Sequence, residues 1–205
     1  MNRRNFIRNV SAFSAVTVLK PEIVFASNNN SAVRIGLVGC GSRATGILGA
    51  MSESSNIQIT ALADLFEDKL ASGADFVNKL NQKKGYALVQ KKNMYAGSDA
   101  YLRLLENKEV DAVIIASPGY SHPQILEDTV AAGKHVYCEK PLAVDGDGCR
   151  QILRTAQNIQ GKISAFDGFQ IRYATPYVEM AKRIKRGDIG DLVTVQLYYF
   201  SSGGA

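Results

Sequence analysis

Apolar residues along the chain gather in short continuous runs, and the segments between them repeat apolar positions with the period of a helix. Continuous apolar runs are typical of parallel strands that are buried on both faces of a sheet. The runs predict strands at 33–38, 57–64, 111–118 and 136–138, and the helical segments cover 43–53, 65–81, 98–107 and 121–132. Strands and helices therefore alternate, which predicts an α/β fold with a doubly wound parallel sheet.

Local signals refine two of these helices. Gly73 interrupts the helical segment 65–81. Ser121 precedes Pro123 and Gln124, and this order predicts a capping box, in which the two polar side chains bind free backbone amides at the start of the helix. Gly133 is expected to end that helix.

The pattern changes near residue 161. Residues 162–173 (KISAFDGFQIRY) predict a strand that runs into a loop, and a helix follows from Thr175 to Gly187. Residues 191–200 then alternate apolar and polar side chains, which predicts a strand of an antiparallel sheet with one buried face. We therefore expect 161–205 to begin a second, α+β domain with a mainly antiparallel sheet. One such strand cannot bury a sheet face, so we expect the sequence to be a fragment of a longer protein.

The first 26 residues have the layout of an export signal, with a basic start, an apolar run at 10–19 and the small residue Ala26 before a cleavage site. Residues 3–7 (RRNFI) resemble a twin-arginine signal, which predicts export of the folded chain to the periplasm or beyond. The apolar run is too short for a membrane span, so no stable membrane insertion is expected, although an uncut leader would act as an anchor. Residues 27–32 are interpreted as a linker.

Charge and cysteine content narrow the functional classes. The formal net charge is +5, but the leader carries four basic residues against Glu22 alone, and the remainder is too nearly neutral to indicate nucleic-acid binding. Cys40, Cys138 and Cys149 are odd in number and not closely paired, which argues against a disulfide framework or a zinc site. No nucleic-acid partner and no metal are therefore expected.

Residues 34–46 (RIGLVGCGSRATG) lead from the first strand through a glycine-rich turn into a helix. Gly39 permits the sharp turn, and Gly41 lets backbone N–H groups approach a pyrophosphate at the start of the helix. Ser42 and Arg43 open that helix beside the expected phosphates. Ala44 holds the third position of the spacing, where it replaces a glycine. The turn predicts a Rossmann dinucleotide-binding domain at 33–160.

Asp64 ends the second predicted strand, 18 residues after Gly46. An acid at this position accepts hydrogen bonds from the adenosine ribose and repels a 2′-phosphate, which favours NAD over NADP. The other interpretation is that Asp64 caps the following helix, and both roles can hold together. Arg43 leaves the choice of dinucleotide open, because NADP would be favoured if its side chain reached a 2′-phosphate.

A second group of polar residues follows the next two strands. Ser117, Pro118 and His122 come after 111–118, and Glu139 and Lys140 come after 136–138. Because ligands bind at the carboxyl ends of parallel strands, we expect all of them to meet the cofactor beside the glycine turn. The alternatives are a solvated His122 in the first turn of its helix and a surface Lys140 beside a turn. A carboxylate and an ammonium group near a nicotinamide suit ribose binding and proton transfer to or from a hydroxyl.

Segments 35–46 (IGLVGCGSRATG), 111–126 (DAVIIASPGYSHPQIL) and 133–145 (GKHVYCEKPLAVD) together resemble the Gfo/Idh/MocA family, which comprises sugar and polyol oxidoreductases related to glucose-fructose oxidoreductase and inositol 2-dehydrogenase. The resemblance covers 33–200. It implies a cis Lys140–Pro141 bond, with Lys140 as the catalytic lysine and Glu139 as a cofactor ligand. It also places Gln170 near the nicotinamide and Arg172 and Tyr173 at the substrate pocket, where ordinary domain-seam roles are the alternative.

The resemblance implies an NAD-dependent oxidoreductase that acts on a carbohydrate hydroxyl, and a homo-oligomer for the intact parent protein. In the family an Asp-x-x-x-His pair completes the catalytic site, and it would fall after residue 205. Two alternatives remain. The first is an NAD-dependent glycoside hydrolase of the α-N-acetylgalactosaminidase type, whose members tend not to keep the Glu-Lys-Pro triplet. The second is a non-catalytic, truncated dinucleotide-binding fragment.

Overall fold

The computed structural model describes residues 32–159, 161 and 163–198. The predicted signal peptide and all but Ala32 of the predicted linker lie outside these residues. Within them, one sheet has the strand order β3-β2-β1-β4-β5-β6, and every neighbouring pair is parallel. The strands are β1 (Val33–Val38), β2 (Ile57–Asp64), β3 (Met94–Ala96), β4 (Ala112–Ile115), β5 (His135–Cys138) and β6 (Ala165–Asp167). This topology confirms the doubly wound α/β fold that the sequence predicts.

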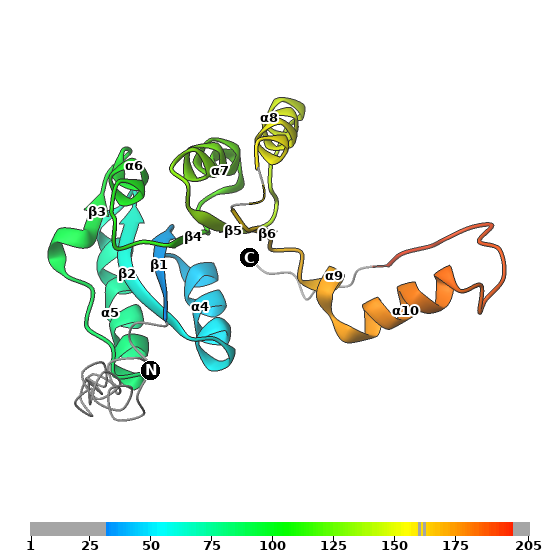
Figure 1. The fold of residues 1–205 in the computed structure, drawn as a ribbon, viewed down its shortest axis with the longest axis horizontal. Helices are drawn as coiled ribbons and strands as arrows, with labels where there is room; N and C mark the ends of the chain where they lie inside the picture. Colours follow the sequence, from blue (N-terminus) through cyan, green and yellow to red (C-terminus); the bar gives the residue numbers. More distant parts are fainter. Residues whose placement is uncertain (1–31, 160, 162, 199–205) are drawn as a thin grey trace, which may run out of the picture.

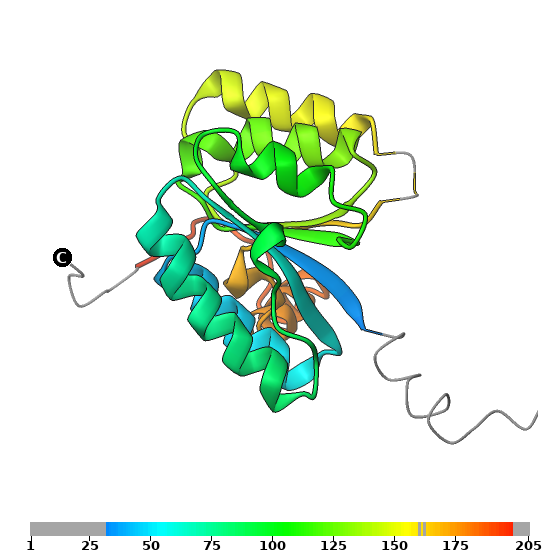
Figure 2. The same ribbon diagram turned by 90° about the vertical axis from the view of Figure 1, so that its left-hand side faces the viewer.

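Helices cover both faces of the sheet (Figures 1 and 2). One face packs against α4 (Ser42–Ser54) and α5 (Glu67–Lys83), and the other against α6 (Ala100–Leu105) and α7 (His122–Ala131), with α8 (Gly146–Gln157) beside α7. Alternation along β1 sends Ile35 and Leu37 into the first core and Val38 into the second. Burial on both faces explains why the strands consist of continuous apolar runs.

The strand β3 and the helix α8 are among the elements that were not predicted from the sequence. The short strand β3 has only three residues and carries no extended apolar run. The helix α8 begins with Gly146 and Gly148, which favour a loop, but the Asp145 carboxylate caps it by accepting a hydrogen bond from the Gly148 N–H at 2.7 Å. The Asp145 cap therefore stabilises the start of a helix that the two glycines made hard to predict from the sequence.

Two predictions about helices are wrong. Gly73 does not interrupt α5, which is continuous from Glu67 to Lys83; it lets the helix pack closely, because a Cβ atom there would lie 2.6 Å from the Cβ of Cys40. Ser121 forms no capping box, because it ends a 3-10 turn, η2 (Gly119–Ser121), in a helical conformation. Its hydroxyl donates to the carbonyl of Pro118, and the Gln124 amide donates to the Asp128 carboxylate.

The last part of the chain also differs from expectation. The strand β6 pairs with β5, so the parallel sheet extends past residue 160, where the sequence pattern placed the start of a second domain. After α9 (Gln170–Tyr173), α10 (Thr175–Lys185) extends away from the sheet, and the segment that follows α10 turns back (Figure 1). Residues 191–198 form no strand, and Val193 and Leu197 are 95% and 89% exposed. An alternating segment becomes a strand only when a partner strand takes its hydrogen bonds, and no described residue does so here.

Within the described residues, no helix combines the length and the apolar character that crossing a membrane requires.

Candidate functional site

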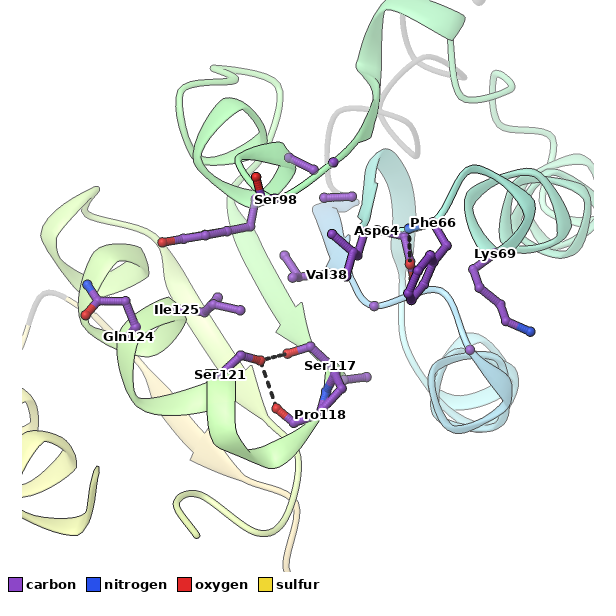
Figure 3. Close-up of a pocket in the computed structure, with 18 of the residues that line it drawn as sticks. Val38, Asp64, Phe66, Lys69, Ser98, Ser117, Pro118, Ser121, Gln124 and Ile125 are labelled. Carbon is purple, nitrogen blue, oxygen red and sulfur yellow. Dashed lines mark hydrogen bonds between the residues drawn. The ribbon is translucent and has the colours of Figure 1, made fainter. Parts of the chain in front are cut away.

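The predicted cofactor residues meet at one edge of the sheet. Because β1, β2, β4 and β5 run parallel, their carboxyl ends point the same way, and each is followed by one of the predicted polar groups. Figure 3 shows Val38 and Asp64 on one side of a cavity, with Ser117 and Pro118 below them and Gln124 and Ile125 opposite. The glycine turn, Asp64 and the Ser117–Pro118 segment therefore lie at one sheet edge, as expected, and their roles towards a cofactor stay predictions.

Gly39 turns the chain out of β1 with a φ of +87°, a conformation that favours glycine. A Cβ atom at this position would lie 2.7 Å from the backbone of Ala116 and Ser117. Its N–H donates to the carbonyl of Ala63 at 2.9 Å. The turn is thus held between the ends of β2 and β4, and a side chain there would push the turn away from the backbone that follows β4.

The backbone conformation of Gly41 does not require glycine, because its φ of −78° suits any residue. A Cβ atom there would meet nothing within 4 Å, so the space above this backbone is open. Gly41 is the N-cap of α4, which has no side-chain cap and no acidic residue in its first turn. Free amides and a positive helix dipole at an open surface are the features that bind phosphate groups.

The Asp64 carboxylate lies directly beside this turn. Its Oδ2 accepts a hydrogen bond from the Cys40 N–H at 2.7 Å, and its Oδ1 accepts one from the Phe66 N–H at 2.9 Å. Phe66, and not Asp64, is the N-cap of α5, so the alternative role of Asp64 as the helix cap is wrong. Each carboxylate oxygen keeps a second lone pair for a ribose hydroxyl.

A cavity of about 620 Å³ extends from Gly41 along Asp64 towards α6 and α7. Its wall is mostly apolar, with Val38, Phe66 and Ile125 among the lining residues, and Ser98 and Gln124 supply polar groups. An apolar slot with a few polar groups at its ends is the usual form of a site for a flat heterocycle. Neither Phe66 nor Ser98 was predicted; Phe66 follows the second strand directly and is 58% exposed, which is unusual for a phenylalanine.

His122 does not face this cavity. Its side chain is buried, with Nδ1 2.7 Å from the Pro141 carbonyl oxygen and Nε2 2.7 Å from the Ser117 carbonyl oxygen. Both ring nitrogens are occupied by backbone groups, so the structure does not support His122 as a direct cofactor ligand. It connects instead the segments that follow β4 and β5. The Ser117 and Ser121 hydroxyls bind each other at 2.8 Å beside it (Figure 3).

Glu139 is a buried carboxylate at the end of β5, with 2% of its surface exposed. Its Oε1 accepts hydrogen bonds from Arg43 Nη2 at 2.8 Å and from the Tyr137 hydroxyl at 2.9 Å, and its Oε2 accepts one from the Lys140 N–H at 3.2 Å. Burial alone would raise the pKa of Glu139, but the hydrogen bonds from Arg43 and Tyr137 outweigh it and the pKa is lowered. The carboxylate is therefore held in its charged form.

Tyr137 was not predicted, although alternation along β5 places it on the same face as Glu139. Burial and the hydrogen bond to Glu139 raise the pKa of Tyr137 to about 12, so the hydroxyl stays a donor. Its ring stacks on Phe166 with the centroids 5.9 Å apart, and Phe166 contacts the ring of Tyr173 at 4.5 Å. These three rings connect β5 to β6 and α9.

Lys140 follows Glu139 and is exposed, and its bond to Pro141 is cis, as the resemblance implies. Among the described residues, none forms a hydrogen bond or ion pair with its ammonium group. Gln170 and Arg172 lie on the exposed helix α9, and Arg172 Nη1 is 3.9 Å from Asp167 Oδ2. The substrate roles of Arg172 and Tyr173 and the cofactor role of Gln170 stay predictions.

Comparison with known proteins gives a consistent result. The profile of GFO_IDH_MocA, described as an oxidoreductase family with an NAD-binding Rossmann fold, matches residues 33–166, more than half of the chain. An inositol 2-dehydrogenase/D-chiro-inositol 3-dehydrogenase of Shouchella clausii is 28% identical over 80% of this chain and 43% of its own length. A glycosyl hydrolase family 109 protein of Shewanella pealeana is 25% identical over 97% of this chain and 46% of its own length.

Among solved structures, a 3-ketoreductase from Actinomadura kijaniata in complex with NADP superposes with a TM-score of 0.56 and 25% identity, covering 78% of this chain and 46% of that one. The chain thus spans about half the length of these relatives. The glycine turn, the strand order and the matched profile agree, and the chain belongs to the Gfo/Idh/MocA oxidoreductase family, with an NAD-binding Rossmann fold.

Proposed function

We propose that the protein is an NAD-dependent oxidoreductase that acts on a hydroxyl group of a sugar or polyol. One observation carries the proposal: an open phosphate-binding turn at Gly41 shares a sheet edge with the Glu139–Lys140 segment. The first feature binds a dinucleotide, and the second supplies groups suited to handling a hydroxyl proton. The inositol dehydrogenase among the relatives supports the same class of substrate.

The residues present fit a dinucleotide. The space above Gly41 is open, the first turn of α4 offers uncapped amides, and the adjoining cavity of about 620 Å³ has an apolar wall that ends at the Asp64 carboxylate. Gly41 and Ser42 would hold the diphosphate, and Asp64 would accept hydrogen bonds from the adenosine ribose. Ser117 and Pro118 line the same cavity at the end of β4.

Two side-chain positions favour NAD over NADP. Asp64 places a negative charge where the 2′-phosphate of NADP would lie. Arg43, which would counter that charge if it pointed towards β2, is bound instead to Glu139 at the end of β5, and β1 and β4 separate these two strands. Lys69 lines the rim of the cavity, but in Figure 3 its side chain points away from Asp64.

Bound nicotinamide supplies a hydride acceptor or donor. The chain's own contribution is to orient the substrate and to move a proton. The exposed ammonium group of Lys140, with no protein partner among the described residues, is free to hold a substrate hydroxyl and exchange its proton. Glu139 fixes the backbone of Lys140 through the hydrogen bond to its N–H.

Calorimetric titration with NADH and NADPH tests the proposal. We expect saturable binding of NADH and at least tenfold weaker binding of NADPH, a difference of about 1.4 kcal/mol. A folded protein that binds neither would contradict it. Turnover is then followed as NADH absorbance with inositols and aldoses as substrates.

A glycoside hydrolase that uses NAD in an elimination cycle is a second candidate, because the family 109 relative aligns with 97% of the chain. The intact Glu139–Lys140–Pro141 triplet favours the dehydrogenase. Release of nitrophenol from an aryl α-N-acetylgalactosaminide without net change in NADH would identify the hydrolase. Binding of NADH without either activity would identify the third candidate, a non-catalytic dinucleotide-binding module.

We also propose that the chain is exported through the twin-arginine pathway, on the strength of residues 3–7 (RRNFI). A fusion of residues 1–32 to a reporter that is active only when exported folded tests this. Replacement of Arg3 and Arg4 by Lys should abolish export. Full export of that variant would contradict the proposal. The homo-oligomeric state implied by the resemblance stays a prediction.

A further inference from the structure

Arg43 connects two parts of the site that lie on different strands. It is the second residue of α4, in the turn of helix whose amides face the phosphate space, and its side chain reaches the carboxylate that follows β5. Nη2 makes this contact, and half of the side chain is exposed. A guanidinium group has five N–H donors in a planar fork, so donors remain for a ligand.

The acceptor of this contact is enclosed. A Cβ atom on Gly168, at the end of β6, would lie 2.6 Å from the Glu139 Oε1 atom, so the backbone there closes over the carboxylate. The Tyr137 hydroxyl also binds Oε1, and the Lys140 N–H binds Oε2. Glu139 therefore has little freedom to move, and a displacement of its carboxylate is transmitted to the peptide that carries Lys140.

We propose that Arg43 is a positioning residue: the buried Glu139 holds its guanidinium group over the start of α4, its remaining donors bind the diphosphate of the dinucleotide, and Glu139 passes the effect of that contact to the backbone of Lys140. The inference rests on the dinucleotide binding proposed above. A diphosphate is the ligand chemistry that suits this position, because Arg forms paired hydrogen bonds with phosphate oxygens. The binding step and the orientation of Lys140 are then coupled through a single carboxylate.

The test measures binding and the Lys140 backbone together. ADP and adenosine are titrated calorimetrically into the wild-type chain and the Arg43→Met variant, and the Lys140 amide resonance is followed in the ¹⁵N-labelled proteins. We expect Arg43→Met to weaken ADP binding about tenfold and to leave adenosine binding unchanged. Saturating ADP should move the Lys140 amide resonance in the wild type and not in the variant.

Arg34→Met is the matched control, because Arg34 also forms an ion pair, with Asp111 directly before the neighbouring strand β4, but at the amino ends of the strands. It should leave ADP binding unchanged. Arg43→Lys keeps the charge without the planar fork and should give an intermediate loss, which keeps the test valid if the Met variant does not fold.

Two results would overturn the inference while the proposed function stands: equal ADP affinity in the wild type and both Arg43 variants, or an unchanged shift of Lys140 in Arg43→Met at saturation. A larger loss for adenosine 2′,5′-bisphosphate than for ADP would place Arg43 at the 2′-phosphate and overturn it as well. If the wild type binds neither ADP nor NADH, the proposed function itself fails, and this inference with it.

Discussion

The carboxylate of Asp64, at the end of β2, accepts a hydrogen bond at 2.7 Å from the backbone N–H of Cys40, in the middle of the glycine turn. The residue proposed to bind the adenosine ribose thus also holds the phosphate-binding loop in place. Its other oxygen binds the Phe66 N–H, so both ends of the carboxylate have a fixed direction. One side chain therefore connects the end of β2 to both the glycine turn and the start of the segment before α5.

Replacing Asp64 by Asn tests this double role. The amide oxygen can still accept from Cys40, but the negative charge that repels a 2′-phosphate is lost. We expect NADH affinity to fall about tenfold and the preference over NADPH to shrink or reverse, since hydrogen bonds to charged groups contribute about 1.5–3 kcal/mol. Calorimetric titration with both dinucleotides measures it. Asp68→Asn, an exposed change in the first turn of α5, is the control and should alter neither affinity.

The two glycines of the turn should respond differently to the same substitution. Gly41→Ala adds a methyl group in open space, so we expect a folded protein, within about 1 kcal/mol of wild-type stability, that binds NADH poorly. Gly39→Ala forces a positive φ and meets backbone at 2.7 Å, so we expect a loss of stability of about 1–3 kcal/mol or more. Denaturant unfolding and NADH titration distinguish them. Wild-type NADH affinity in Gly41→Ala would show that the phosphates lie elsewhere.

Lys140→Met separates binding from chemistry. The lysine ammonium group is exposed and carries no structural hydrogen bond among the described residues, so its removal should leave the fold and NADH binding within twofold of wild type. Turnover of the sugar or polyol should fall by about 10²-fold or more, the contribution typical of a positioned acid–base group. Steady-state kinetics measure this. Retention of wild-type kcat would remove Lys140 from the mechanism.

Acid should weaken the fold through Glu139. Hydrogen bonds from Arg43 and Tyr137 lower the pKa of Glu139 in the folded protein despite its burial, so the charged form stabilises the fold above the ordinary glutamate pKa of about 4.3. That contribution is lost as the pH falls through the lowered pKa of the folded state. Glu139→Gln should be less stable than wild type at pH 7, by about 1–3 kcal/mol.

The stability difference between these two proteins should shrink as the pH falls below about 4, where the wild-type carboxyl takes up a proton. Urea unfolding at a series of pH values measures it. Asp147→Asn, at an exposed ion pair on α8, is the control and should show no comparable pH dependence. A constant difference between wild type and Glu139→Gln from pH 7 to pH 3 would mean that the charge of Glu139 does not contribute to stability.

The sequence by itself determined the parallel sheet, the turn between β1 and α4 and the strand ends at which Asp64, Ser117 and Glu139 lie. These features follow from local causes: buried parallel strands must be apolar throughout, and a turn that approaches phosphate needs glycine. Asp145 shows the limit of such signals, because the glycines that follow it conceal the helix that it caps.

Only the tertiary structure decided which groups meet. Arg43 and Glu139 are 96 residues apart, so no local pattern relates them. Their contact exists because both lie at the carboxyl ends of the strands, where the long Arg43 side chain reaches the residue that follows β5. The His122 side chain does not line the proposed cofactor cavity, because carbonyl oxygens from two separate loops contact both of its ring nitrogens. Residues 191–198 have the alternation of a strand, but no strand among the described residues pairs with them. Pairing and burial depend on contacts between distant segments, and the order of residues along the chain does not contain them.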